Sequence, residues 1–69
     1  MKIQYDKQAD ALYIYLTKGR VKKTSKVGKN VLVDYGEKDR LIGVEFYKIS
    51  RSVSKGVLQS VSVELPISA

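Results

Sequence analysis

Residues 3–16 read IQYDKQADALYIYL, which is two runs of alternating apolar and polar residues on either side of KQAD. A period of two is typical of strands that bury one face. If KQAD forms a hairpin loop, Tyr5 lies opposite Leu12, and the apolar faces of the two strands agree. The stretch therefore predicts an antiparallel hairpin. Its strands are expected at residues 2–6 and 11–17.

The same alternation continues as far as residue 48 and predicts three further strands. Glycine residues mark the turns between them. Each strand can pair with the one before it in a register that keeps one face mostly apolar, for example with Val33 opposite Ile42. We therefore predict a β-dominated α+β fold built on a five-stranded antiparallel meander. The three further strands are expected at residues 20–27, 31–35 and 40–48.

The last third of the chain is expected to cover the apolar face, because a sheet buries its apolar side against another layer. Every fourth residue from Ile49 to Val61 is apolar, as on one side of a helix, whereas residues 60–65 alternate as in a strand. We predict a short C-terminal helix near residues 50–55 and then a sixth strand. The alternative is one helix that continues to Val61. The sequence leaves open which face of the sheet is covered.

The chain has 69 residues and contains neither cysteine nor histidine. This length fits a single domain, residues 1–69. So short a chain buries little surface, and without disulfides or a cysteine- or histidine-based metal site it needs another source of stability. We therefore expect a homo-oligomer, with a dimer favoured. No run approaches the roughly 18 apolar residues of a membrane span, and no signal-peptide pattern is present, so we expect a cytoplasmic protein with no membrane contact.

Positive charge is concentrated between Lys18 and Lys29, where six basic residues occur without an acidic one, in a chain of net charge +6. In the meander, one face of this third strand adjoins a tyrosine-bearing face of the second. Such a surface can neutralise phosphates and stack bases, so it is a candidate macromolecule-binding face. Alternatively, the lysines keep an edge strand from aggregating. The candidate residues are Tyr13, Tyr15, Arg20, Lys22 and Lys26.

A second candidate surface is an interface formed by Leu32, Leu41 and Gly43 on the outer face of the sheet. Exposed leucines in a patch usually mark an interface. A glycine inside a strand marks a bulge or the close approach of another backbone. The alternative is that the C-terminal segment of the chain folds over these residues.

No pattern in the sequence indicates catalysis. Asp34 and Glu45 are expected on the outer face of neighbouring strands, whereas Asp6 and Asp10 suit turn positions, where carboxylates bond nearby backbone. Without histidine or cysteine the chain lacks the usual general base and nucleophile. We therefore predict a non-enzymatic protein with no catalytic residues, no metal site and no cofactor.

Three motifs resemble the family called domain of unknown function 2283: YDxxADALYI at residues 5–14, VLVDY at 31–35 and LIGVE at 41–45. The resemblance extends over residues 1–52. It implies a small β-rich bacterial or archaeal protein with no established activity, and some members have been proposed as the antitoxin-like half of a toxin–antitoxin pair. This chain departs from typical members by carrying lysines where they carry acidic residues. These lysines are Lys22, Lys23, Lys26 and Lys29.

Together these patterns favour a non-enzymatic protein-interaction module that self-associates and binds a protein partner. The resemblance makes an antitoxin-like role its most specific form. The alternative is a nucleic-acid-binding sheet that uses the basic, tyrosine-bearing face.

Overall fold

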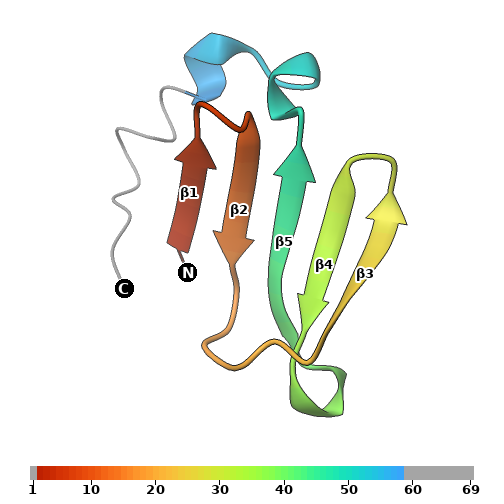
Figure 1. Ribbon diagram of the computed structural model, residues 1–69. Coiled ribbons are helices and arrows are strands. Elements are labelled where there is room, and N and C mark those ends of the chain that lie inside the picture. Colours follow the sequence, from red (N-terminus) through yellow and green to blue (C-terminus); the bar gives the residue numbers. More distant parts are fainter. Residues whose placement is uncertain (1, 59–69) are drawn as a thin grey trace.

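A single antiparallel sheet of five strands forms the body of the molecule (Figure 1). The computed structural model describes residues 2–58. The strands lie in the order β1-β2-β5-β4-β3, and short 3-10 helices follow β4 and β5. The β-dominated antiparallel fold predicted from the sequence is confirmed. The elements are β1 (Lys2–Asp6), β2 (Ala11–Tyr15), β3 (Lys23–Gly28), β4 (Val31–Tyr35), η1 (Glu37–Asp39), β5 (Leu41–Tyr47) and η2 (Ile49–Arg51).

The predicted meander order is wrong at one step, because β2 pairs with β5 and not with β3. β5, the last strand in sequence within residues 2–58, is thus the middle strand in space. β5 is the longest strand and is largely apolar, so it suits the position where both edges are paired. β3 carries two lysines and is mostly exposed, so it suits the sheet edge.

Residues 16–22 do not form the two-residue turn that the sequence suggests. They cross the ends of β5 and β4 and reach the far edge of the sheet (Figure 1). The amide of Leu16 donates to the carbonyl oxygen of Ile42 at 2.8 Å, and the amide of Lys22 donates to that of Tyr35 at 2.7 Å. Because this crossing uses residues expected in the third strand, β3 begins at Lys23 and not at residue 20.

The predicted register of the first hairpin, with Tyr5 opposite Leu12, is confirmed. The β4–β5 register is shifted by two residues, so Val33 lies opposite Val44 instead of residue 42. A β-bulge between Asp34 and the next residue of β4 accompanies the shift. Because the shift is even, it leaves the apolar face unchanged.

The C-terminal helix is present in two separate pieces. After η2, the chain is non-helical as far as Ser54, and residues 55–58 then form a helical turn. The Ser54 hydroxyl oxygen caps this turn by accepting the Val57 amide at 3.3 Å. The alternative of one continuous helix from Ile49 is therefore wrong. The predicted sixth strand, residues 60–65, lies outside the described residues.

One face of the sheet is apolar, and the other described residues cover it only in part. The molecule measures 15 Å in its thinnest direction, which is close to a single layer. In the described part of the chain, most apolar side chains on this face are half-buried. The buried apolar residues are Ala11, Val33, Ile42, Ile49 and Leu58. On the apolar face, the half-buried positions are Ile3, Tyr5, Leu12, Ile14, Val31, Val44 and Phe46.

Candidate functional site

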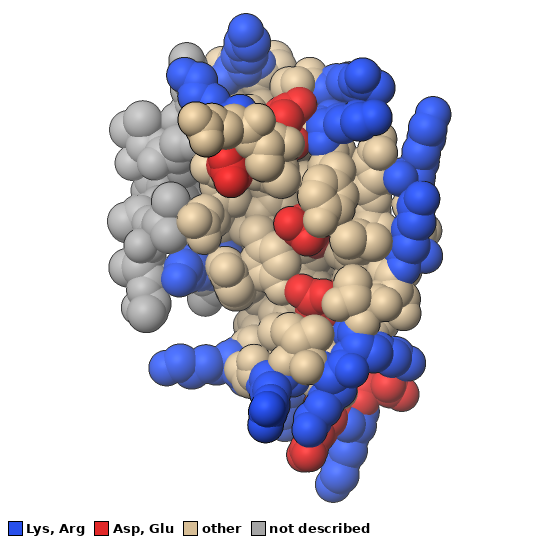
Figure 2. All heavy atoms as spheres, in the orientation of Figure 1, with Lys and Arg blue, Asp and Glu red and all other residues tan. Residues whose placement is uncertain are grey.

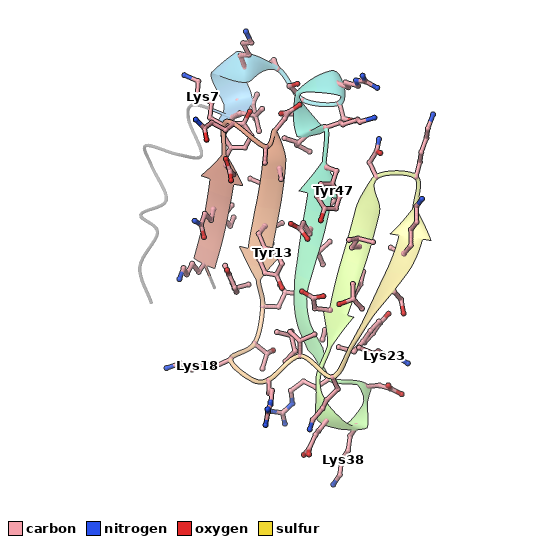
Figure 3. All side chains as sticks on the ribbon, viewed as in Figure 1. Lys7, Tyr13, Lys18, Lys23, Lys38 and Tyr47 are labelled. Carbon is pink, nitrogen blue, oxygen red and sulfur yellow. The ribbon has the colours of Figure 1, made fainter. Side chains whose placement is uncertain are left out.

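Tyrosines and carboxylates lie together in the middle of the other face of the sheet, which faces the viewer in Figure 3. Neighbouring strands bring them together, because antiparallel partners share a face. β2 contributes two tyrosines, β5 contributes a tyrosine and a carboxylate, and β4 contributes a carboxylate. We call this surface the tyrosine–carboxylate face. Its members are Tyr13, Tyr15, Asp34, Glu45 and Tyr47.

Gly43 is the position that allows this arrangement. A Cβ atom at Gly43 would lie 2.6 Å from the Tyr13 hydroxyl oxygen, so the Tyr13 ring occupies the space that a side chain would fill. Across this gap the Tyr13 hydroxyl donates a hydrogen bond to Asp34 Oδ2. The Thr24 hydroxyl donates to Asp34 Oδ1 at 2.5 Å. A chain of side-chain contacts thus links β2, β4 and β3 across β5.

Two tyrosines of this face, Tyr13 and Tyr47, are held in the neutral form. Burial, together with the hydrogen bond to Asp34, raises the pKa of Tyr13. The hydrogen bond to Glu45, 3.1 Å from the Tyr47 hydroxyl, raises the pKa of Tyr47. A tyrosine nucleophile or base needs a lowered pKa, which is the opposite shift. These tyrosines therefore act as hydrogen-bond donors and packing surfaces.

Asp10 joins the first hairpin to the segment after β5. Its carboxylate accepts hydrogen bonds from the Ser50 hydroxyl at 2.6 Å, the Ser50 amide at 3.1 Å and the Tyr5 hydroxyl at 3.1 Å. Its backbone carbonyl accepts the Ile49 amide at 3.1 Å. The bonds from Ser50 are the largest cause that lowers the pKa of Asp10. This carboxylate has a structural role.

Asp6 has the turn role that its position predicts. Its Oδ1 accepts the amides of Gln8 and Ala9 at 3.0 and 3.1 Å, which closes the first hairpin loop. The prediction that Asp10 bonds nearby backbone is wrong, because its partner Ser50 is 40 residues away.

The candidate macromolecule-binding residues are not all neighbours, although the strand registers place Tyr13 and Lys26 on the same face of the sheet. Tyr13 and Tyr15 are on β2, whereas Lys26 is on β3, and two further strands separate them. Arg20 and Lys22 lie in the crossing connection and on no strand. Figure 2 shows acidic side chains in the middle of this face and basic side chains around its margin. The predicted β2–β3 pairing, which placed the lysines beside the tyrosines, is the step that fails.

The candidate interface residues also differ in their surroundings. Leu41, at the start of β5, is 46% exposed. Leu32 is half-buried and lies opposite Glu45. Gly43 is buried under Tyr13, so the close approach that it permits comes from a side chain of the same protein.

Basic residues lie together at two hollows on the surface of the protein. The larger, of about 770 Å³, lies where the crossing connection meets η1, and we call it the basic hollow. The smaller, of about 410 Å³, lies at the other end of the sheet and is lined by Tyr47 with Lys26, Lys29 and Lys48. The basic side chains of the basic hollow are Lys18, Arg20, Lys22, Lys38 and Arg40.

Three of these five cations, at positions 18, 38 and 40, are not among the candidate site residues predicted from the sequence. Lys18 belongs to the basic run recognised in the sequence, whereas the local sequence gives no signal that Lys38 and Arg40 join it, because the two loops meet only when residues 16–22 cross the end of the sheet. Among the described residues, no group of three or more acidic, histidine or cysteine side chains is placed to hold a metal ion. No helix in the same part of the chain is long and apolar enough to cross a membrane.

Comparison with curated proteins and with solved structures gives no match. A family model described as "Protein of unknown function (DUF2283)" matches residues 2–50. This span contains all five strands and ends at Ser50, the partner of Asp10. The chain therefore belongs to the DUF2283 family.

Proposed function

We propose that the chain is a non-enzymatic protein-interaction module that pairs with a second copy of itself through the apolar face of its sheet. The observation that carries the proposal is the half-buried state of Ile3, Ile14 and Val44 on that face. Exposed apolar surface in a contiguous patch usually marks an interface. Covering it would supply the stability that so small a core lacks.

A second copy suits this face because its strand positions on β1, β2, β5 and β4 carry no charged side chain. The chain as a whole has a net charge of +6, so most other pairings of two copies would bring lysines together. The molecule measures 37 by 28 Å in its two larger directions. A face of this size is comparable to the roughly 800 Å² that each partner buries in a standard interface.

A role without catalysis is supported by the state of the polar groups. The raised pKa values of Tyr13 and Tyr47 disfavour activated phenols. The carboxylates of Asp10 and Asp34 are occupied by hydrogen bonds that join strands and loops. Carboxylates whose oxygens already accept hydrogen bonds within the protein stabilise the fold.

The mass of the protein in solution tests the self-association. We expect light scattering at micromolar concentration to give twice the chain mass of 7.8 kDa. Val44→Lys should give the single-chain mass, because it places a charge in the middle of the apolar face. Ile3→Lys, at the edge of the face, makes the same test if the central substitution unfolds the sheet.

Leu41→Lys is the matched control, since it adds the same charge at an exposed leucine of the alternative interface. It should remain a dimer. A single-chain mass for the wild-type protein would overturn the proposed pairing. Dissociation of the dimer by Leu41→Lys, but not by Val44→Lys, would also overturn it.

An antitoxin-like role is the finer form of this proposal and rests on the family resemblance. In that form the module binds a second, different protein. Co-purification of the tagged chain from its native host tests it, because a stoichiometric protein partner is expected. Recovery of the dimer alone would contradict the antitoxin-like form and leave the self-association standing.

A further inference from the structure

The basic hollow is built from two loops that the strand order brings together. The crossing connection supplies Lys18, Arg20 and Lys22, whereas η1 and the residue after it supply Lys38 and Arg40. Figure 2 shows basic side chains gathered at this end of the molecule. In Figure 3, the labelled Lys18 and Lys38 lie at the same end, far from Lys7.

The backbone of the hollow is fixed. The amide of Gly36 donates to the Arg40 carbonyl oxygen at 2.7 Å, which closes the η1 loop. A Cβ atom at Gly36 would lie 3.1 Å from the Arg20 carbonyl oxygen, so the two loops are in close backbone contact. The same Cβ would lie 2.9 Å from Ile42, a buried side chain with 5% exposure. The backbone that carries the cations is therefore held in place by a hydrogen bond and by close packing.

The charges of the hollow are unbalanced. Five cations line it together with one carboxylate, that of Glu37. The only ion pair among the described lining residues joins Lys22 to Glu37 at 3.9 Å, and both side chains are well exposed, so it is weak. Four positive side chains thus line one hollow without a carboxylate partner within residues 2–58. A ligand with several closely spaced negative charges would relieve their repulsion.

We propose that the basic hollow binds a run of phosphate groups, either the backbone of a single-stranded nucleic acid or a polyphosphate chain. Arg20 and Arg40 have planar guanidinium groups that match phosphate oxygens in pairs, and Lys18 and Lys38 add point charges. None of the described residues that line the hollow is aromatic, so these residues offer no surface for base stacking. Recognition of nucleic acid would therefore depend on phosphates and not on base sequence.

Binding is tested by fluorescence anisotropy with a labelled oligothymidylate, and with inorganic polyphosphate of equal phosphate number as competitor. If the four unpaired cations each contact a phosphate, the logarithm of the affinity should fall with that of the salt concentration at a slope of about −3. Arg20→Glu with Arg40→Glu should weaken binding by roughly tenfold or more. If circular dichroism shows that this variant has lost its sheet, Lys18→Glu with Lys38→Glu repeats the test at two other exposed positions.

The matched control is Lys7→Glu with Lys55→Glu, two exposed lysines outside the hollow. It changes the net charge by the same amount, from +6 to +2, and should leave the affinity within about twofold. Equal losses in the two variants would overturn the proposal, because they would show attraction to net charge alone. Competition by polyglutamate as strong as that by polyphosphate would also overturn it.

The two sources of phosphate are distinguished by competition. If polyphosphate displaces the oligonucleotide at the same phosphate concentration, the hollow recognises the phosphate chain itself. If it does not, and the hollow variant still loses affinity, the sugar–phosphate backbone is the ligand. Absence of binding to both at low salt would overturn the proposal. Because the cations of the hollow lie in loops at one end of the sheet and the proposed dimer forms through strand positions, failure of either proposal leaves the other intact.

Discussion

Gly43 determines how the polar side of the sheet packs. It is the one described strand position on β5 where a neighbouring tyrosine ring replaces a side chain. The ring of Tyr13 reaches over it to Asp34, and its centroid lies 4.3 Å from that of Tyr15. A glycine that weakens an isolated strand is thus compensated by an aromatic side chain from the next strand.

Gly43→Ala is expected to lower the free energy of unfolding by about 1–3 kcal/mol, because its methyl group must displace the Tyr13 ring. Urea denaturation followed by circular dichroism measures the change. Gly28→Ala is the matched control, since its Cβ would meet nothing closer than 3.5 Å. In a Tyr13→Ala background the cost of Gly43→Ala should shrink. An unchanged urea midpoint for Gly43→Ala would contradict this account.

The lowered pKa of Asp10 predicts that the stability of the fold decreases at acidic pH. Its pKa is lowered by folding from the ordinary 3.8, so its contribution is present above that value and is lost as pH falls through the lower folded value. Asp10→Asn should remove this part of the pH dependence of the urea midpoint. Asparagine tolerates the left-handed backbone at this position, where φ is 53°.

Ser50→Ala provides the control for that experiment. It deletes the hydroxyl donor but keeps the amide that also bonds Asp10. The acid dependence should therefore become smaller without disappearing. If Asp10→Asn and the wild-type protein lose stability in parallel below pH 4, the carboxylate does not carry the effect.

Residue roles were predictable where they depend on near neighbours. Asp6 sits two and three residues before the amides that it accepts, and its turn role follows from that spacing. The bonds that Ser50 donates to Asp10 and that Tyr13 donates to Asp34 span 40 and 21 residues. Such contacts depend on which strands become neighbours, and alternation in the sequence does not encode that.

At the scale of elements, hairpins were predictable and the order of strands was not. β1–β2 and β3–β4 are joined by short loops, so their pairing follows from local sequence. Lys18 and Gly19 look like a turn that would pair β2 with β3. The burial of β5 between β2 and β4 outweighs that local preference. It separates the lysines of β3 from the tyrosines of β2, which were predicted to be neighbours.

The edge strand β3 gives a prediction at this scale. β3 pairs only with β4 in the described part of the chain, and Lys26 is exposed on it. Charged side chains on an edge discourage pairing with other molecules. Lys26→Val should therefore increase aggregation, measured by light scattering during storage at high concentration. Lys7→Val, in a loop, should not, and equal aggregation of the two variants would exclude the edge as the cause.

At the scale of the whole molecule, a one-layer sheet links stability to association. If two copies pair through their apolar faces, the melting temperature should rise with protein concentration, because association stabilises only the folded chains. Calorimetry over a hundredfold range of concentration measures this. Val44→Lys should melt at a lower temperature that no longer depends on concentration. A concentration-independent melting temperature for the wild-type protein would contradict pairing.

The central position of β5 has a consequence for how the chain acquires its fold during synthesis. The β1–β2 and β3–β4 hairpins emerge first, and they do not pair with each other. An isolated two-stranded hairpin is marginally stable at best in water. β5 is made after both, and it joins them by pairing with β2 on one side and β4 on the other. Until Tyr47 has left the ribosome, the nascent chain holds two hairpins without a common sheet, and the five described strands form one sheet only when β5 inserts between them.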